Sequence, residues 1–253
     1  MEFMKVYCGG EARWVLSEPA GLYWLDGDPF SEWTRAADVS TLAGIRFLAP
    51  CAATKVVAVG VNYTSHAEEM GSQLPEEPLL FLKPPSSIVG HRETIVYPTH
   101  LSRRVDYEGE LALVVGRRAR CISREEAPEY VLGYTCANDV TARDLQRRDN
   151  QWTRAKGFDT FCPLGPVIST DADPSSLLIR TRVNGVLRQE AWTSEMVFPV
   201  DVLISHISQV MTLEPGDVIL TGTPSDVGEL HPGDMVEVEI EGIGTLTNCV
   251  AEA

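Results

Sequence analysis

Positive charge is scarce in this sequence. Its 253 residues include 21 Lys and Arg against 36 Asp and Glu, which gives a formal net charge of −15. A field of that sign repels phosphate backbones and anionic membrane surfaces, so nucleic-acid binding is disfavoured as the main function. No apolar run approaches the roughly 18 residues that span a bilayer, and the first residues lack the basic-then-apolar pattern of a secretory signal. We therefore expect a cytoplasmic protein that binds neither membrane nor nucleic acid.

Paired cysteines are also missing. The sequence has six cysteines, and no two of them have the spacing of a C-x-x-C motif or a zinc ribbon. Buried reduced thiols are the expected role, and a cysteine nucleophile at Cys136 or Cys162 is the alternative. Repeats, low-complexity tracts and long linkers are absent as well, and the hydrophobic fraction of 44% is that of an ordinary globular protein.

Strand patterns dominate the chain, and few segments have helical periodicity. Apolar runs predict strands over 55–60, 78–82, 111–116, 178–183, 217–220 and 235–240, and a hairpin turn at Asn184-Gly185. Short helices are predicted over 65–70, 124–131, 141–150 and 200–211. Because these helices do not alternate with the strands, the prediction is a strand-dominated α+β fold. It divides into a small strand-rich N-terminal domain, residues 1–52, and a larger domain, residues 53–253.

Glu108 and Glu110 stand two residues apart at the start of an apolar strand. Side chains alternate between the two faces of a strand, so both carboxylates point to the same side. Like charges so close together repel each other, and a hard divalent cation lets both stay ionised. The solvent face of an amphipathic strand is the alternative interpretation, and for these two residues alone it is the better one.

The segment that follows Cys136 shifts that balance toward a site. Asn138 or Asp139 is a natural N-cap, and a helix that begins there places Asp139, Arg143 and Gln146 on one face. Residues 143–156 are locally basic in an acidic chain, which favours a small anionic ligand. We interpret Arg147, Arg148 and Arg154 as members of a solvated helix face, and Arg143 and Lys156 as functional.

Two further segments carry candidate groups. Thr64 or Ser65 is expected to cap a short helix that Gly71 ends, with His66 and Glu69 three residues apart on one face. A histidine oriented by a carboxylate is the usual device for moving a proton, although such pairs also occur by chance on surface helices. The Gly222-Thr223 turn follows an apolar strand and can offer backbone N–H groups and a hydroxyl to a carboxylate.

Taken together, these motifs resemble the fumarylacetoacetate hydrolase family in its short branch. The resemblance covers about four-fifths of the chain. It rests on six ordered segments: 59–70 (VGVNYTSHAEEM), 78–84 (PLLFLKP), 105–112 (VDYEGELA), 138–146 (NDVTARDLQ), 155–159 (AKGFD) and 220–224 (LTGTP). The family fold that it implies is a mixed β-roll. Only about 50 residues precede these motifs, too few for the larger N-terminal domain of the long members, so fumarylacetoacetate itself is not the expected substrate.

The resemblance also implies roles for individual residues. The family's divalent metal, usually Mg²⁺ and sometimes Mn²⁺ or Ca²⁺, would be held by Glu108, Glu110 and Asp139. The implied catalytic residues are His66, Glu69 and Lys156, of which the first two belong to a segment that orders when ligand binds. The implied substrate-binding residues are Arg143, Gln146, Gly222 and Thr223. Similar proteins are commonly homodimers, so a homodimer is expected here.

The reaction expected from the resemblance starts from a 2-oxo or 2,4-dioxo acid. Such an acid can chelate a metal through its carboxylate and 2-oxo oxygens, and the cation stabilises the enolate. Hydrolysis of a C–C bond, decarboxylation and keto–enol isomerisation can all follow, in the breakdown of aromatic compounds or dicarboxylates. The alternative from another class is a non-catalytic module that binds metal or ligand with the same fold. His66, Glu69 and Lys156 favour the interpretation as an enzyme, because a protein that only binds a ligand does not need residues that move protons.

Overall fold

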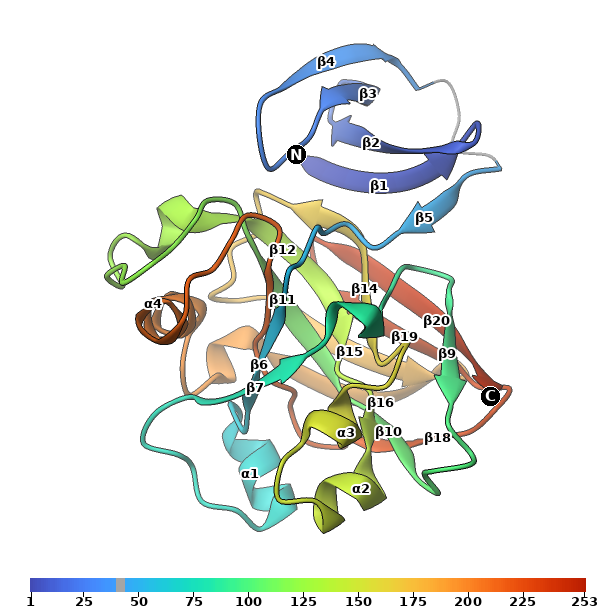
Figure 1. The fold of residues 1–253 in the computed structure, drawn as a ribbon, viewed down its shortest axis with the longest axis vertical. Coiled ribbons are helices and arrows are strands. Elements are labelled where there is room, and N and C mark those ends of the chain that lie inside the picture. Colours follow the sequence, from blue (N-terminus) through green and yellow to red (C-terminus); the bar gives the residue numbers. More distant parts are fainter. Residues whose placement is uncertain (40–43) are drawn as a thin grey trace.

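The computed structural model describes residues 1–39 and 44–253. Strands dominate these residues, as the alternating sequence patterns predict, and the few helices lie around the edges of the sheets (Figure 1). The expected strand-dominated α+β fold is confirmed. No helix in the described ranges has both the length and the apolar character needed to cross a membrane.

The largest sheet joins the N-terminal strands to the middle of the chain. Its main path runs through β4 (Trp33–Asp38), β3 (Gly21–Gly27), β2 (Glu11–Glu18), β1 (Glu2–Cys8), β14 (Cys162–Ser169), β12 (Val131–Asn138), β11 (Gly109–Val115), β17 (Val218–Leu220), β6 (Val56–Gly60) and β7 (Leu79–Lys83), while β5 (Arg46–Leu48) pairs with β1 and β8 (Ile88–Val89) with β14. β1 pairs with β14, so the N-terminal strands are hydrogen-bonded to the rest of the molecule. The domain boundary after residue 52 falls between β5 and β6 and stays a prediction.

Two smaller sheets complete the β-structure of the described residues. One has the order β16 (Val186–Trp192), β15 (Leu178–Val183), β19 (Met235–Ile240), β20 (Gly244–Glu252) and β9 (Thr94–Tyr97), and the other has β13 (Thr141–Ala142), β10 (Val105–Tyr107) and β18 (Gly228–Leu230). Leu111 and Leu113 of β11 belong to the same buried cluster as Ile179 of β15 and Val238 of β19. Burial of apolar side chains between these strands is the main source of stability for this part of the fold. The hairpin predicted at Asn184-Gly185 is present, and both residues have the positive φ angles that its turn requires.

The helices are α1 (Thr64–Met70), α2 (Arg143–Arg148), α3 (Thr153–Lys156) and α4 (Val200–Val210), with 3₁₀ turns at Pro85–Ser87, Ala127–Tyr130 and Thr193–Glu195. The α-helix predicted over 124–131 was wrong, because only the 3₁₀ turn forms there. In an α-helix over 124–131, Pro128 would lie in the interior, where it has no N–H to donate to the Arg124 carbonyl, and Val131 already begins β12.

Two helix starts also differ from the prediction. Asn138 ends β12 and Thr141 pairs with β10, so Asp139 does not cap a helix and α2 begins only at Arg143. A helix that began at Asp139 would need the backbone of Thr141 and Ala142, which is paired with β10 instead. In α1 the N-cap is Tyr63, which makes no side-chain capping bond, so the caps predicted at Thr64 or Ser65 were wrong. The predicted end is confirmed, because Gly71 has the left-handed conformation of a C-cap.

Asp217, just before β17, anchors the connection that leads into β6. Its buried carboxylate accepts hydrogen bonds from the backbone N–H groups of Thr54 (2.8 Å), Lys55 (3.1 Å) and Glu214 (2.8 Å) and from the Thr54 hydroxyl (2.8 Å), and it pairs with the Lys55 ammonium. Burial raises the pKa of Asp217, but these donors outweigh burial and hold the pKa below its usual value.

We expect Asp217→Asn to lower the free energy of unfolding by about 2–4 kcal/mol at pH 7, because an amide nitrogen cannot accept from Glu214 and Lys55. A carboxyl group with a lowered pKa in the folded state stabilises the protein fully above the unfolded pKa of about 4 and loses that effect as the pH falls through the folded pKa. Urea unfolding should therefore give a constant difference from pH 7 to about 5 and a smaller one below about pH 4. The exposed Asp159→Asn is the matched control, and equal stability of the two variants at pH 7 would contradict the assignment.

Candidate active site

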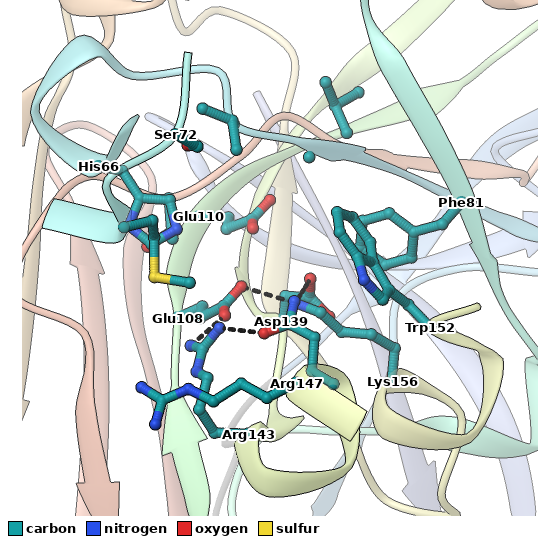
Figure 2. Close-up of a pocket in the computed structure, with 16 residues that line it drawn as sticks. His66, Ser72, Phe81, Glu108, Glu110, Asp139, Arg143, Arg147, Trp152 and Lys156 are labelled. Carbon is teal, nitrogen blue, oxygen red and sulfur yellow. Dashed lines mark hydrogen bonds and ion pairs between the residues drawn. The ribbon is translucent and has the colours of Figure 1, made fainter. Parts of the chain in front are cut away.

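Three carboxylates meet where β10 passes into β11 beside the end of β12. Glu108 precedes β11, Glu110 is its second residue, and Asp139 follows β12. The pairing of Gly109 with Asn138 brings the two strands together at this point. One oxygen from each of the three carboxylates lies within 4.8 Å of the others, and all three side chains are buried. The prediction that Glu108 and Glu110 point to one side is confirmed, and Asp139 joins them from just beyond the end of the neighbouring strand, β12 (Figure 2).

Gly109, between the two glutamates, lets the backbone of β11 lie close against Thr181 of β15. A Cβ atom at that position would lie 2.0 Å from the Thr181 hydroxyl oxygen, well inside van der Waals contact. The backbone of Gly109 is held by the Gln189 side chain, whose amide oxygen accepts from the Gly109 N–H at 3.0 Å. The Thr223 hydroxyl donates to the Gly109 carbonyl at 2.9 Å. This short link between the glutamates is therefore fixed from two sides.

Buried cations compensate two of the three carboxylates. The Lys156 ammonium lies 2.7 Å from Glu108 Oε2 and 2.6 Å from Asp139 Oδ2, and the Lys83 ammonium pairs with the other oxygen of Asp139. Arg143 Nη2 donates to Glu108 Oε1 at 2.5 Å. Burial raises the pKa of Glu108, but Lys156 and Arg143 outweigh it and hold this pKa below its usual range. Glu108 is therefore ionised at neutral pH.

Glu110 has no such cation beside it. Among the described residues its carboxylate makes no ion pair, and it accepts one hydrogen bond, from the backbone N–H of Gly222 at 2.7 Å. Burial, Asp139 and Glu108 together raise the pKa of Glu110 well above its ordinary value. The Gly222 turn thus offers its N–H to a carboxylate, as its sequence suggested, and here that carboxylate is Glu110.

These residues fit a hard divalent cation. The donor set consists of carboxylate oxygens alone, which Mg²⁺, Mn²⁺ and Ca²⁺ prefer and which Zn²⁺ sites rarely use without nitrogen or sulfur. Glu110 lies against two other carboxylates and has no ion pair within the described ranges, so a bound cation would supply the positive charge that this side chain lacks. Glu108, Glu110 and Asp139 are therefore the residues that would hold the metal.

His66 and Glu69 of α1 form a pair at the edge of this cluster. His66 Nδ1 lies 3.1 Å from Glu69 Oε2, and the other Glu69 oxygen accepts from the Asp226 N–H at 3.2 Å. The imidazole is buried, with 8% of its side chain exposed, whereas 32% of the Glu69 side chain is exposed. In Figure 2 the imidazole approaches the carboxylates from the side opposite to Trp152. A carboxylate that holds Nδ1 leaves Nε2 of the ring to exchange a proton with a ligand.

A cavity of about 270 Å³ connects these groups. Its lining includes the three carboxylates, His66, Lys156, Arg143, Gln146 and Thr223, together with Val59, Gly60, Val61, Met70, Ser72, Phe81, Arg147 and Trp152. The Phe81 and Trp152 rings pack edge to face, with centroids 5.3 Å apart, and form an aromatic wall. A Cβ at Gly60 would lie 2.8 Å from the Trp152 ring, so this glycine lets the indole lie against β6. The cavity thus combines an apolar wall with convergent polar groups, as small-molecule sites do.

Three of the predicted substrate-binding residues, Arg143, Gln146 and Thr223, line the cavity, and each also makes hydrogen bonds within the protein. Arg143 lines the cavity, but its guanidinium also pairs with buried Asp106 (2.8 Å) and Glu108, and it donates to the Gln146 amide oxygen at 2.6 Å. Because the Gln146 amide oxygen is occupied by Arg143, this side chain has its amide nitrogen left to donate to a ligand. The Thr223 hydroxyl lines the cavity and accepts from Gln189 Nε2 at 2.9 Å. Substrate binding by these residues stays a prediction.

Sequence reasoning missed several members of the site. Lys83 ends an apolar strand motif and pairs with Asp139; a lysine that ends such a run needs a buried partner, and that is the signal in the sequence that could have found it. Asp106 and Thr141 were also missed. Asp106 holds Arg143, and the Thr141 hydroxyl donates to Glu108 Oε1 at 3.0 Å. Arg147, interpreted as part of a solvated face, is exposed as expected and also lines the cavity, a role that the sequence did not indicate.

The cysteines play no part in this site. Cys136 and Cys162 are buried, and burial raises the pKa of each thiol to about 12. A thiol with that pKa is almost entirely protonated at neutral pH, so neither residue fits the role of a nucleophile. Cys51 is buried too, which agrees with the expected structural role, whereas Cys121 and Cys249 are exposed.

Comparisons with known proteins agree with the motifs. Residues 55–251 match the family described as "Fumarylacetoacetate (FAA) hydrolase C-terminal". Oxaloacetate tautomerase YisK of Bacillus subtilis is 44% identical over 211 residues, which cover 79% of this chain and 70% of that protein. Two solved structures cover the whole chain at 44% identity. They are 5-carboxymethyl-2-hydroxymuconate delta-isomerase from Mycobacterium smegmatis (TM-score 0.92, 100% of that chain) and 2-hydroxyhepta-2,4-diene-1,7-dioate isomerase from Mycobacterium marinum (TM-score 0.91, 98% of that chain). The chain therefore belongs to the fumarylacetoacetate hydrolase family of enzymes.

Proposed function

We propose that this protein is a divalent-metal-dependent enzyme that interconverts the keto and enol forms of a 2-oxo or 2,4-dioxo acid. The observation that carries the proposal is a buried triad of carboxylates beside an oriented histidine in one cavity. The named relatives, an oxaloacetate tautomerase and two isomerases of unsaturated diacids, favour isomerisation over hydrolysis or decarboxylation at this site.

Each group has a task in this reaction. A divalent cation held by the three carboxylates supplies Lewis acidity that favours negative charge on a nearby oxygen. Lys156 and Arg143 add positive charge beside the place where an enolate oxygen develops. In the keto-to-enol direction the His66 imidazole takes the proton from the carbon next to the 2-oxo group and gives a proton to the oxygen of the resulting enolate, and the reverse direction moves the proton from the enol oxygen back to that carbon. Glu69 holds the ring and stabilises its cationic form. Phe81 and Trp152 keep bulk water from one side of the ligand.

Further features of the proposal extend the sequence predictions. Mg²⁺ is the proposed physiological metal, with Mn²⁺ or Ca²⁺ as substitutes, because the donors are hard oxygens. The substrate is a small anionic oxo acid, since three cations lie around the carboxylates of the cavity. We further propose a homodimer that works in the cytoplasm, in the breakdown of aromatic compounds or dicarboxylates.

A substrate panel tests the proposal. Purified protein is incubated with oxaloacetate, an acylpyruvate and a hydroxymuconate-type diacid, each with Mg²⁺ and again after dialysis against a chelator, and the enol absorbance is followed in the ultraviolet. We expect Mg²⁺-dependent interconversion with no carbon dioxide and no cleaved acid among the products. Release of either product would reassign the reaction. No turnover of any compound, in protein that demonstrably binds Mg²⁺, would favour a non-catalytic binding module.

A further inference from the structure

Arg147 differs from the other cations around the cavity because no carboxylate of the described residues pairs with it. Lys156, Lys83 and Arg143 are each held by carboxylates at the buried end. Arg147 lines the same cavity, is exposed to solvent, and forms no ion pair with any residue in the described ranges. An arginine in this situation is free to bind a carboxylate that a ligand brings.

The geometry of α2 explains why Arg147 faces the cavity and its neighbour does not. Arg143, Gln146 and Arg147 are related by three and four residues, so they share one face of the helix, and all three line the cavity. Arg148 is turned away from that face. It pairs with Asp149 at 3.6 Å, and 62% of its side chain is exposed.

This helix face leads from the inside of the cavity to its mouth. Arg143 is buried beside Glu108, and Arg147 lies one turn later, about 6 Å along the helix axis, where the side chain meets solvent. A 2-oxo acid whose reacting end lies among the buried carboxylates would extend along this face. In a diacid of five to seven carbons the second carboxylate is then placed within reach of the Arg147 guanidinium.

We propose that Arg147 binds the distal carboxylate of the ligand and so makes the enzyme selective for oxo diacids over oxo monoacids. The inference rests on the proposed function and adds to it a substrate class and the residue that selects it. Arg147 acts in recognition and takes no part in the proton transfer.

Paired ligands of equal shape test the selectivity. Isothermal titration of the Mg²⁺-loaded protein compares 2-oxoadipate with 6-methyl-2-oxoheptanoate, in which an isopropyl group replaces the distal carboxylate. Oxalate, which has no distal group, reports on the inner site alone. We expect wild type to bind the diacid at least about fivefold more tightly than the monoacid, with a preference that shrinks as salt rises.

Arg147→Met keeps the apolar stem and removes the charge. We expect it to weaken 2-oxoadipate about five- to tenfold and to change the monoacid and oxalate affinities less than about twofold. Arg147→Lys should restore part of the diacid preference. Arg148→Met removes the same charge one residue away and should leave all three affinities unchanged.

The outcomes separate the two proposals. Normal oxalate binding together with equal loss of diacid and monoacid in Arg147→Met overturns the role of Arg147 and leaves the proposed function standing. The role of Arg147 is also overturned if Arg148→Met weakens the binding of 2-oxoadipate as much as Arg147→Met does, because the loss then comes from the lower positive charge of the protein and not from one specific contact. Absence of any Mg²⁺-dependent oxalate binding in wild type contradicts the proposed function, and the role of Arg147 falls with it.

Discussion

Replacing Glu110 with Gln is expected to lower the Mg²⁺ affinity at least about a hundredfold and the turnover number at least about a thousandfold. The side chain keeps its shape, and its amide oxygen can still accept the Gly222 N–H. What the variant loses is a charged oxygen ligand in a set of three. Mn²⁺ binding followed by electron paramagnetic resonance measures the first effect, and enol absorbance measures the second.

The stability of the same variant separates a lost ligand from a damaged fold. Glu110 is buried beside Asp139 and Glu108 and has no ion pair within the described part of the chain. Removal of its charge therefore relieves repulsion in the metal-free protein, and the Tm without metal should equal or exceed that of wild type. The exposed Glu125→Gln is the matched control for the same chemical change. Unchanged Mg²⁺ affinity in Glu110→Gln would remove this residue from the metal site.

The second large effect is expected at His66. His66→Ala should lower kcat about a hundredfold or more, because a positioned general base contributes that much to proton transfer. The Mg²⁺ affinity should be unchanged, since the imidazole is hydrogen-bonded to Glu69 and makes no bond to the three carboxylates. Steady-state kinetics at saturating Mg²⁺, with the Mn²⁺ titration alongside, give both quantities.

Two further variants sharpen this result. Glu69→Gln keeps the imidazole and weakens only its orientation and the stability of its cation, so its loss of kcat should be smaller than that of His66→Ala. The exposed His100→Ala removes an imidazole elsewhere on the surface and should have wild-type kinetics. If His66→Ala retains half of the wild-type kcat, the proton is moved by another group.

The carboxylate triad could be predicted because local rules determine most of its placement. The alternation of side chains along a strand puts Glu108 and Glu110 on one side, and the family motifs point to Asp139. Lys83 and Asp139 are 56 residues apart, and no local pattern relates them. Their contact depends on how β7 and β12 are arranged in the sheet, which periodicity alone does not determine.

Spacing relates Arg147 to Arg143, but it does not show which face of α2 meets the cavity. Arg147 is exposed, as expected for a solvated face, and it also lines the cavity. It follows Arg143 by four residues, and residues at that spacing share a face wherever the helix begins. The orientation of that face depends on tertiary contacts, such as the pairing of Thr141 with β10 just before the helix. Periodicity alone does not determine such contacts.

The most direct test of the central claim is the rate of enol loss from oxaloacetate in one sample taken through three states. The protein is assayed with Mg²⁺, after dialysis against a chelator, and after Mg²⁺ is restored, with the enzyme-free rate at each metal concentration subtracted. We predict a rate that falls to background without metal and recovers when metal returns. A chelated protein that remains as fast as the Mg²⁺-loaded one would contradict a metal-dependent role for Glu108, Glu110 and Asp139.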